Sequence, residues 1–89
     1  MRLDVLLFEL RLFKSRTQAH DAIEAGHVLL GGARVKPSHE ARAGDRVRLT
    51  REEGSEGRFR ARTLEILELP RRSLSREAAR ALVREVPAD

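Results

Sequence analysis

The stretch LRLFKSRTQAHDAIEAG, residues 10–26, contains a helix start, a helix body and a helix stop in that order. Ser15 followed by Gln18 is a capping-box pattern, in which each side chain satisfies a backbone donor left free at the helix start. Gly26 suits the left-handed residue that commonly follows the last turn of a helix. We therefore predict a short helix between these two signals.

The residues around this helix predict what it packs against. Its buried stripe is formed by Ala19, Ala22 and Ile23, and the small side chains let another helix approach closely. A suitable partner precedes it, because four leucines at i, i+3, i+4 and i+7 form one apolar helix face: Leu3, Leu6, Leu7 and Leu10.

Short strands are expected after the two helices. Residues 27–30 and 33–36 flank Gly31-Gly32, a pair that supplies the positive φ angles of a two-residue hairpin turn. Residues 46–49 alternate basic and apolar side chains, as a half-buried strand does.

The C-terminal part is expected to add a strand and a helix. Residues 58–62 alternate basic and apolar side chains, and the apolar parity shifts near Thr63, which predicts a bulge or strand end. We interpret Arg58, Arg60 and Arg62 as the solvent face of an edge strand, where charge discourages pairing with other sheets. The last helix is expected after Pro70, with Ser73 or Ser75 as its cap and Leu74, Ala78, Leu82 and Val86 on one side.

Composition restricts the class of protein. Eighty-nine residues, 40% hydrophobic and 36% charged, form one small globular domain with a modest core. The chain has no cysteine for disulfides, no run of about eighteen apolar residues and no signal-peptide pattern, so we expect a cytoplasmic protein without a membrane partner. Three phenylalanines and no Tyr or Trp argue against RNA modules that stack bases on aromatic platforms.

A cluster of cations lies at the junction of the two predicted helices. Arg11, Lys14 and Arg16 contribute three positive charges and no acid intervenes. Free backbone N–H groups at residues 16–18 would lie beside them, and residues 35–38 follow a hairpin that returns Lys36 toward them. A compact cationic surface on a rigid support is typical of a protein that binds a phosphate backbone.

No catalytic or metal-binding constellation accompanies these cations. His20, Asp21 and Glu24 share one helical turn but lack the second cluster of ligands that a metal site needs. Ser15 is committed to its cap and is not placed to act as a nucleophile with His20 and Asp21. We expect a non-enzymatic protein with no cofactor and no metal.

Taken in order, these pieces resemble the S4-like RNA-binding domain family. The resemblance is carried by Arg2-Leu3-Asp4, residues 10–16, residues 23–28, Val35-Lys36-Pro37-Ser38, and Gly44-Asp45 before a strand. Residues 59–61 and 70–72 before the last helix look like the small ribosome-associated heat-shock branch of that family.

The resemblance implies an α+β fold with the α-L RNA-binding motif, which is two packed helices with a small antiparallel sheet. It assigns this motif to residues 1–50, and residues 51–89 add a strand and a C-terminal helix that pack on the same domain. The residues that it implies for contact with structured RNA are Arg2, Arg11, Phe13, Lys14, Ser15, Arg16, Thr17, Gln18, His20, Lys36, Pro37 and Ser38.

The resemblance also implies the large ribosomal subunit as partner, in the rescue or recycling of stalled subunits. Val5 stands where the family usually has a lysine, and the sequence ends at Asp89 without the long basic tail of the heat-shock branch. Because the basic tail is missing, we expect weak and salt-sensitive attachment to the ribosome. We also expect a monomer.

Two other function classes are compatible with the pattern. A DNA-binding regulator is one, because two short helices and a tight turn mimic a helix-turn-helix, although the second helix offers few base-reading side chains beyond Arg16, Gln18 and His20. DNA is therefore expected to bind more weakly than structured RNA. An accessory domain of an RNA-modifying enzyme is the other, but no catalytic domain accompanies it here.

Overall fold

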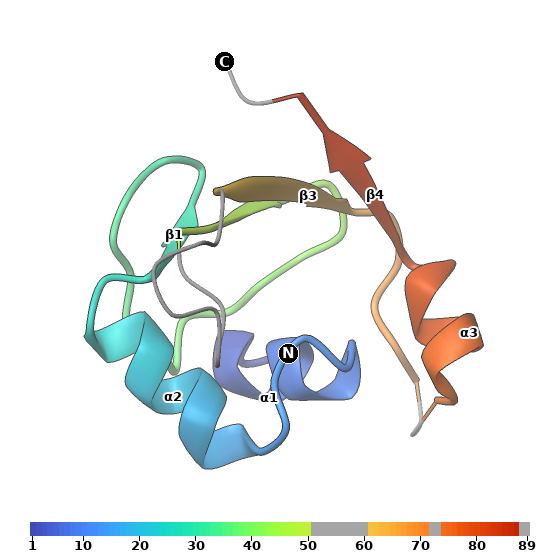
Figure 1. Ribbon diagram of the computed structural model, residues 1–89, viewed down its shortest axis with the longest axis horizontal. Helices are drawn as coiled ribbons and strands as arrows, with labels where there is room; N and C mark the ends of the chain where they lie inside the picture. The colour runs from blue at the N-terminus through green and yellow to red at the C-terminus, as the bar shows by residue number, and fades with distance from the viewer. Residues whose placement is uncertain (51–60, 72–73, 88–89) are drawn as a thin grey trace.

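The helices and the sheet form two layers (Figure 1). The computed structural model describes residues 1–50, 61–71 and 74–87, in which helices α1 and α2 lie against a four-stranded antiparallel sheet and α3 lies toward one side. The elements in chain order are α1 (Leu3–Glu9), α2 (Arg16–Glu24), β1 (Val28–Leu30), β2 (Arg46–Leu49), β3 (Arg62–Ile66), α3 (Arg76–Arg80) and β4 (Val83–Val86). The predicted α+β class, with two packed helices and a small antiparallel sheet, is confirmed. None of the helices in the described residues is long and apolar enough to cross a membrane.

Helix α1 buries the leucine face that its spacing predicts, since all four leucines are buried. Its first backbone N–H groups find acceptors outside the helix: Leu3 donates to the carbonyl of His39 at 2.8 Å, and Asp4 donates to that of Pro37 at 3.1 Å. Residues 37–39 therefore cross the start of α1 and satisfy donors that a helix start leaves unpaired.

Helix α2 begins and ends close to the predicted signals. The Oγ of Ser15 accepts a hydrogen bond from the backbone N–H of Gln18 at 3.1 Å, and Gly26 follows the helix with φ of 81°. Ala19 and Ile23 are almost completely buried where α2 packs on α1. The small side chain of Ala19 permits this close approach.

The strands pair in chain order, β1-β2-β3-β4, and every pair is antiparallel. Val28 of β1 pairs with Leu49 of β2, and both side chains are buried. Leu64 and Ile66 of β3 join them and the leucines of α1 in one hydrophobic cluster. Burial of this shared apolar face holds the two layers together.

The predicted strand at residues 33–36 is wrong. The two glycines before it do turn the chain, with φ of 58° and 82°, but a single bridge between Leu30 and Ala33 is all that forms, and β1 pairs with β2 instead. Most side chains at residues 33–36 are exposed, whereas β2 brings two buried side chains to the sheet. Apolar burial therefore selects β2 as the partner.

The predicted C-terminal helix is also shorter than its spacing indicates. Ser75 caps it by accepting from the N–H of Ala78 at 3.2 Å, and Ser73 lies outside the described residues. The helix has five residues, and the chain then turns into β4, so the predicted apolar face along residues 74–86 does not form. Val83 and Val86 are β-branched and cover the edge of β3, which overrides the helical spacing.

Strand β3 agrees with the prediction in where it begins and differs from it in two other respects. The strand begins at Arg62, one residue before Thr63, so the strand end predicted as the alternative to a bulge is present. Its register runs unbroken through Thr63, which pairs with Arg48 on one side and Val86 on the other, so no bulge forms there. Arg62 consequently lies on an internal strand rather than an edge strand. Arg58 and Arg60 fall outside the described residues.

Candidate nucleic-acid interface

A buried carboxylate organises the surface at the start of α1. Asp4 is 5% exposed and accepts hydrogen bonds from Arg2 Nε at 3.1 Å, from Arg2 Nη2 at 3.0 Å and from the backbone N–H of Val5 at 2.8 Å. Burial raises the pKa of Asp4, but these hydrogen bonds and the positive charges of Arg2 and Arg16 outweigh burial and lower the pKa below its ordinary 3.8. The ionised carboxylate therefore holds Arg2 on the side of the molecule that carries Arg16.

The start of α2 retains donors for an anion. Of the three N–H groups predicted to be free at residues 16–18, that of Gln18 is taken by Ser15. No described residue accepts a hydrogen bond from the backbone N–H of Arg16 or Thr17, and both side chains are exposed. The helix dipole adds partial positive charge at this end, so a phosphate oxygen fits the position.

The cap at the start of α2 can be tested by stability. Replacing Ser15 with alanine should lower the free energy of unfolding by about 1 kcal/mol, because the N–H of Gln18 loses its acceptor. Thermal unfolding followed by circular dichroism measures the loss. Ser38→Ala, at an exposed serine, is the control and should change stability by less than about 0.5 kcal/mol. Unchanged unfolding of Ser15→Ala with lost ligand binding would show that the hydroxyl contacts the ligand directly.

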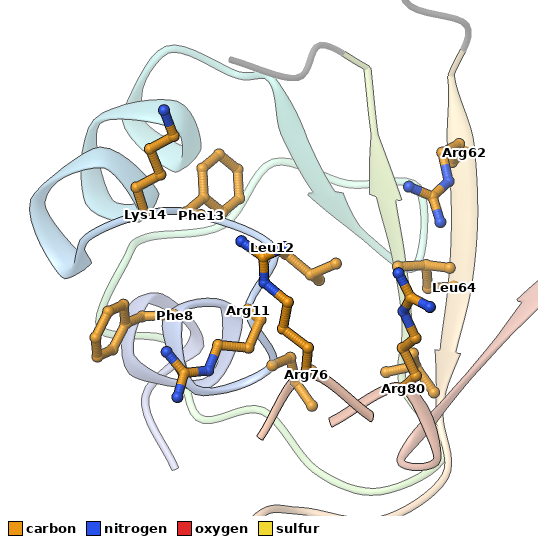
Figure 2. A pocket seen from close by; sticks show the side chains of 11 residues that line it. Phe8, Arg11, Leu12, Phe13, Lys14, Arg62, Leu64, Arg76 and Arg80 are labelled. Carbon is orange, nitrogen blue, oxygen red and sulfur yellow. The ribbon is translucent and has the colours of Figure 1, made fainter. Parts of the chain in front are cut away.

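A hollow of about 590 Å³ opens beside this surface, between the loop that follows α1 and helix α3 (Figure 2). Apolar side chains from α1, its following loop, β3 and β4 form part of its lining. The remaining described residues that line it are all cationic, and none is acidic: Arg11, Lys14, Arg62, Arg76 and Arg80. The hollow therefore combines positive charge with apolar surface.

The cations of the hollow differ in how they are held. Arg62 Nε donates to Glu85 Oε1 at 2.6 Å, so its charge is paired. Arg11 donates from Nε at 3.0 Å and from Nη2 at 2.8 Å to the carbonyl oxygen of Leu74, which fixes the side chain without neutralising its charge. Three others form no ion pair within the described part of the chain: Lys14, Arg76 and Arg80.

The backbone of Arg11 has φ of 63°, a left-handed conformation that residues with a side chain rarely adopt. Such a conformation costs about 1 kcal/mol or more, and the two hydrogen bonds to Leu74 help to offset it. The sequence predicts that Arg11 neutralises a phosphate. In the structure its guanidinium ties the loop after α1 to the segment before α3.

The structure separates the predicted contact residues into two neighbouring groups and one outlier. The first group lies at or beside the starts of α1 and α2: Arg2, Ser15, Arg16, Thr17, Gln18, Lys36, Pro37 and Ser38. The second group lines the hollow: Arg11, Phe13 and Lys14. Because Lys14 directly precedes the cap of α2, the two groups meet there.

The outlier is His20, one turn further along α2. Its Nδ1 lies 3.4 Å from Asp21 Oδ1, and its Nε2 lies 3.5 Å from Glu24 Oε1. Acidic side chains therefore surround this histidine, and a phosphate would have to approach against their charge. The described residues contain no group of three or more side chains arranged to hold a metal ion.

Sequence reasoning did not single out Arg76 and Arg80, which line the hollow. Their spacing of four places them on one face of the predicted helix, which was a usable signal. That this face opens toward Lys14 depends on the pairing of β4 with β3 and on the contact between Arg11 and Leu74, neither of which local sequence indicates.

Comparison with known proteins identifies the family. Among solved structures, the chain is similar to the trimeric heat shock protein 15 of Vibrio cholerae, with a TM-score of 0.83 and 28% identity over 97% of this chain and 81% of that chain. No curated protein sequence matches well enough to count as a relative. Residues 1–47 match the sequence model of the S4 domain, and neither likeness favours a DNA-binding regulator. Because that match covers more than half of the 89 residues and the fold agrees, this protein belongs to the S4 domain family and binds RNA.

Proposed function

We propose that this protein is a non-enzymatic factor that binds structured ribosomal RNA of the large subunit through the start of α2. The observation that carries the proposal is the set of unpaired donors there: the backbone N–H groups of Arg16 and Thr17, flanked by the exposed side chains of Lys14 and Arg16. A helix anchored in the core holds these donors in place before the ligand arrives. Folded RNA is recognised mainly through its backbone and shape, which suits such fixed donors.

The choice of ribosomal RNA as the ligand rests on similarity in sequence and fold to known proteins. The sequence resembles the ribosome-associated heat-shock branch of the S4 family, and the fold is similar to that of heat shock protein 15. Both support a cytoplasmic role in the rescue or recycling of stalled subunits. The acidic pair Asp21 and Glu24 on α2 disfavours the DNA alternative, because a recognition helix in a DNA groove would bring these carboxylates close to phosphates.

Single substitutions at the start of α2 test the phosphate contacts. Lys14→Ala and Arg16→Ala should each reduce the salt dependence of RNA binding, the slope of log K against log salt, by about one, because each removes one phosphate contact. Filter binding to a structured ribosomal RNA fragment over a range of salt measures the slope, with duplex DNA as competitor. Arg84→Ala is the matched control, since Arg84 Nη2 lies 2.8 Å from Glu65 Oε1 and its charge is already paired. Equal losses in all three variants would contradict a localised site.

The partner can be identified in cell lysate. We expect the protein to sediment with the large ribosomal subunit in a sucrose gradient at low salt and to leave it progressively as salt rises. Arg16→Ala should leave at lower salt than the unsubstituted protein. Recovery only at the top of the gradient, with or without stalled ribosomes, would exclude the ribosome as partner. Migration with the small subunit alone would place the binding site on the small subunit and contradict the proposed large-subunit partner.

A further inference from the structure

We propose that the hollow between the loop after α1 and helix α3 binds an unpaired stretch of the same RNA, beside the structured part held at the start of α2. The inference rests on the proposed function, because it assigns the hollow to the same ligand. It adds a second contact surface, in which Arg76 and Arg80 of α3 take part.

The charge of the lining favours an anionic ligand. The described lining contains five cations and no acid, and two unpaired arginines, Arg76 and Arg80, lie four residues apart on a helix of only five residues. Like charges at this spacing repel each other and weaken so short a helix. Figure 2 shows the side chains of Arg62 and Arg80 on the sheet side of the hollow, while Arg76 extends toward Leu12. An anionic ligand in the hollow would relieve this repulsion.

The apolar part of the lining distinguishes an unpaired strand from a duplex. Leu12, Leu64 and Val83 share the hollow with the cations, and two of the three phenylalanines of the chain, Phe8 and Phe13, also line it. A duplex presents phosphates and sugars and hides its bases, so it would leave this apolar surface uncovered. Unpaired nucleotides present both parts, with bases for the apolar surface and phosphates for the arginines. The low aromatic content of the chain argued against base stacking, but the structure gathers two of its few phenylalanines in this one hollow.

The hollow is continuous with the start of α2. Lys14 lines the hollow and immediately precedes Ser15, the cap of α2, so it belongs to both surfaces. A strand that leaves the structured RNA at the start of α2 therefore meets positive charge continuously as it enters the hollow. No described acidic residue interrupts this route along residues 10–18.

The experiment compares two RNAs, a ribosomal hairpin and the same hairpin with a single-stranded extension. For the unsubstituted protein, the extension should raise affinity about tenfold, the equivalent of about one stacked base. It should also steepen the salt slope by about 0.7 for each phosphate that the hollow neutralises. The double variant Arg76→Ala/Arg80→Ala should bind the plain hairpin normally and lose most of the gain from the extension. Arg76→Lys/Arg80→Lys should keep the salt slope, and Arg84→Ala should keep the whole gain.

The outcomes separate this inference from the proposed function. Failure of the unsubstituted protein to bind the plain hairpin would overturn the proposed function, whereas normal hairpin binding with no gain from the extension would overturn only the hollow. An affinity gain from the extension that survives the double substitution would also overturn the assignment of the hollow to RNA. If, in addition, an acidic peptide bound the unsubstituted protein and not the double variant, the hollow would be assigned to an acidic protein segment instead. Circular dichroism checks that each variant is folded. If the double variant unfolds, Arg80→Gln alone replaces it and should lose part of the affinity gain.

Discussion

Replacing Ile23 with alanine is expected to lower the free energy of unfolding by about 3 kcal/mol, within the range for large-to-small substitutions in a core. Ile23 is 1% exposed and joins the cluster that holds α2 against α1 and the sheet. The substitution removes three carbon atoms and leaves a cavity that the surrounding core fills only in part. Chemical denaturation measures the loss as a lower midpoint with an unchanged slope.

The matched control at this position is Ile23→Val, which removes one carbon and should cost about 1 kcal/mol. At temperatures where the alanine variant is still folded, its salt slope for RNA binding should equal that of the unsubstituted protein, because no cation has been removed. A changed slope in the folded alanine variant would show that Ile23 positions the start of α2 more directly than its burial indicates.

Replacing Asp4 with asparagine is expected to cost about 2 kcal/mol at neutral pH. The buried carboxylate accepts two hydrogen bonds from Arg2 and one from the N–H of Val5, and hydrogen bonds to a charged group are worth about 1.5–3 kcal/mol. The asparagine is uncharged and supplies one carbonyl oxygen in place of two carboxylate oxygens. Asp21→Asn is the control, because that carboxylate is exposed, and it should change stability by less than about 0.5 kcal/mol.

The stability that the Asp4 carboxylate contributes should decrease in acid. The pKa of Asp4 is lower in the folded protein than its ordinary 3.8, so the ionised form is favoured in the folded state. Its contribution is fully present above the ordinary pKa and is lost as pH falls through the folded pKa. The stabilities of the Asp4→Asn variant and the unsubstituted protein should therefore converge in acid. A difference that stayed constant from neutral pH to well below pH 3.8 would show that the loss arises from packing and not from charge.

The structure changes how the cations of this protein are interpreted. Arg11, Lys14 and Arg16 are neighbours along the chain, but Arg11 is held by the carbonyl of Leu74, so its removal would affect both charge and the attachment of the C-terminal segment. Lys14 and Arg16 are therefore better probes of phosphate contact. Arg2 is held in a similar way by Asp4, which makes its position dependent on a buried acid.

Local sequence signals were sufficient to predict both N-terminal helices. The leucine spacing of α1, the cap at Ser15 and the glycine after α2 all act within about one turn of the chain, and the structure places each where the sequence predicts. The S4 resemblance, carried by residues 1–50, was confirmed for the same reason, since its motifs are short and ordered along the chain. The cations at the junction were identified from sequence because they are adjacent in it.

The sequence by itself determined the two helices, their packed face and the cationic junction between them, because these depend on side-chain spacing and on caps a few residues away. Tertiary structure alone decided that β1 pairs with β2, that the end of the predicted last helix becomes β4, and that Arg76 and Arg80 share a hollow with Lys14. The physical reason is the same in each case. Strand pairing and the shape of a hollow follow from burying apolar surface contributed by distant segments, and this long-range gain overrides local propensity.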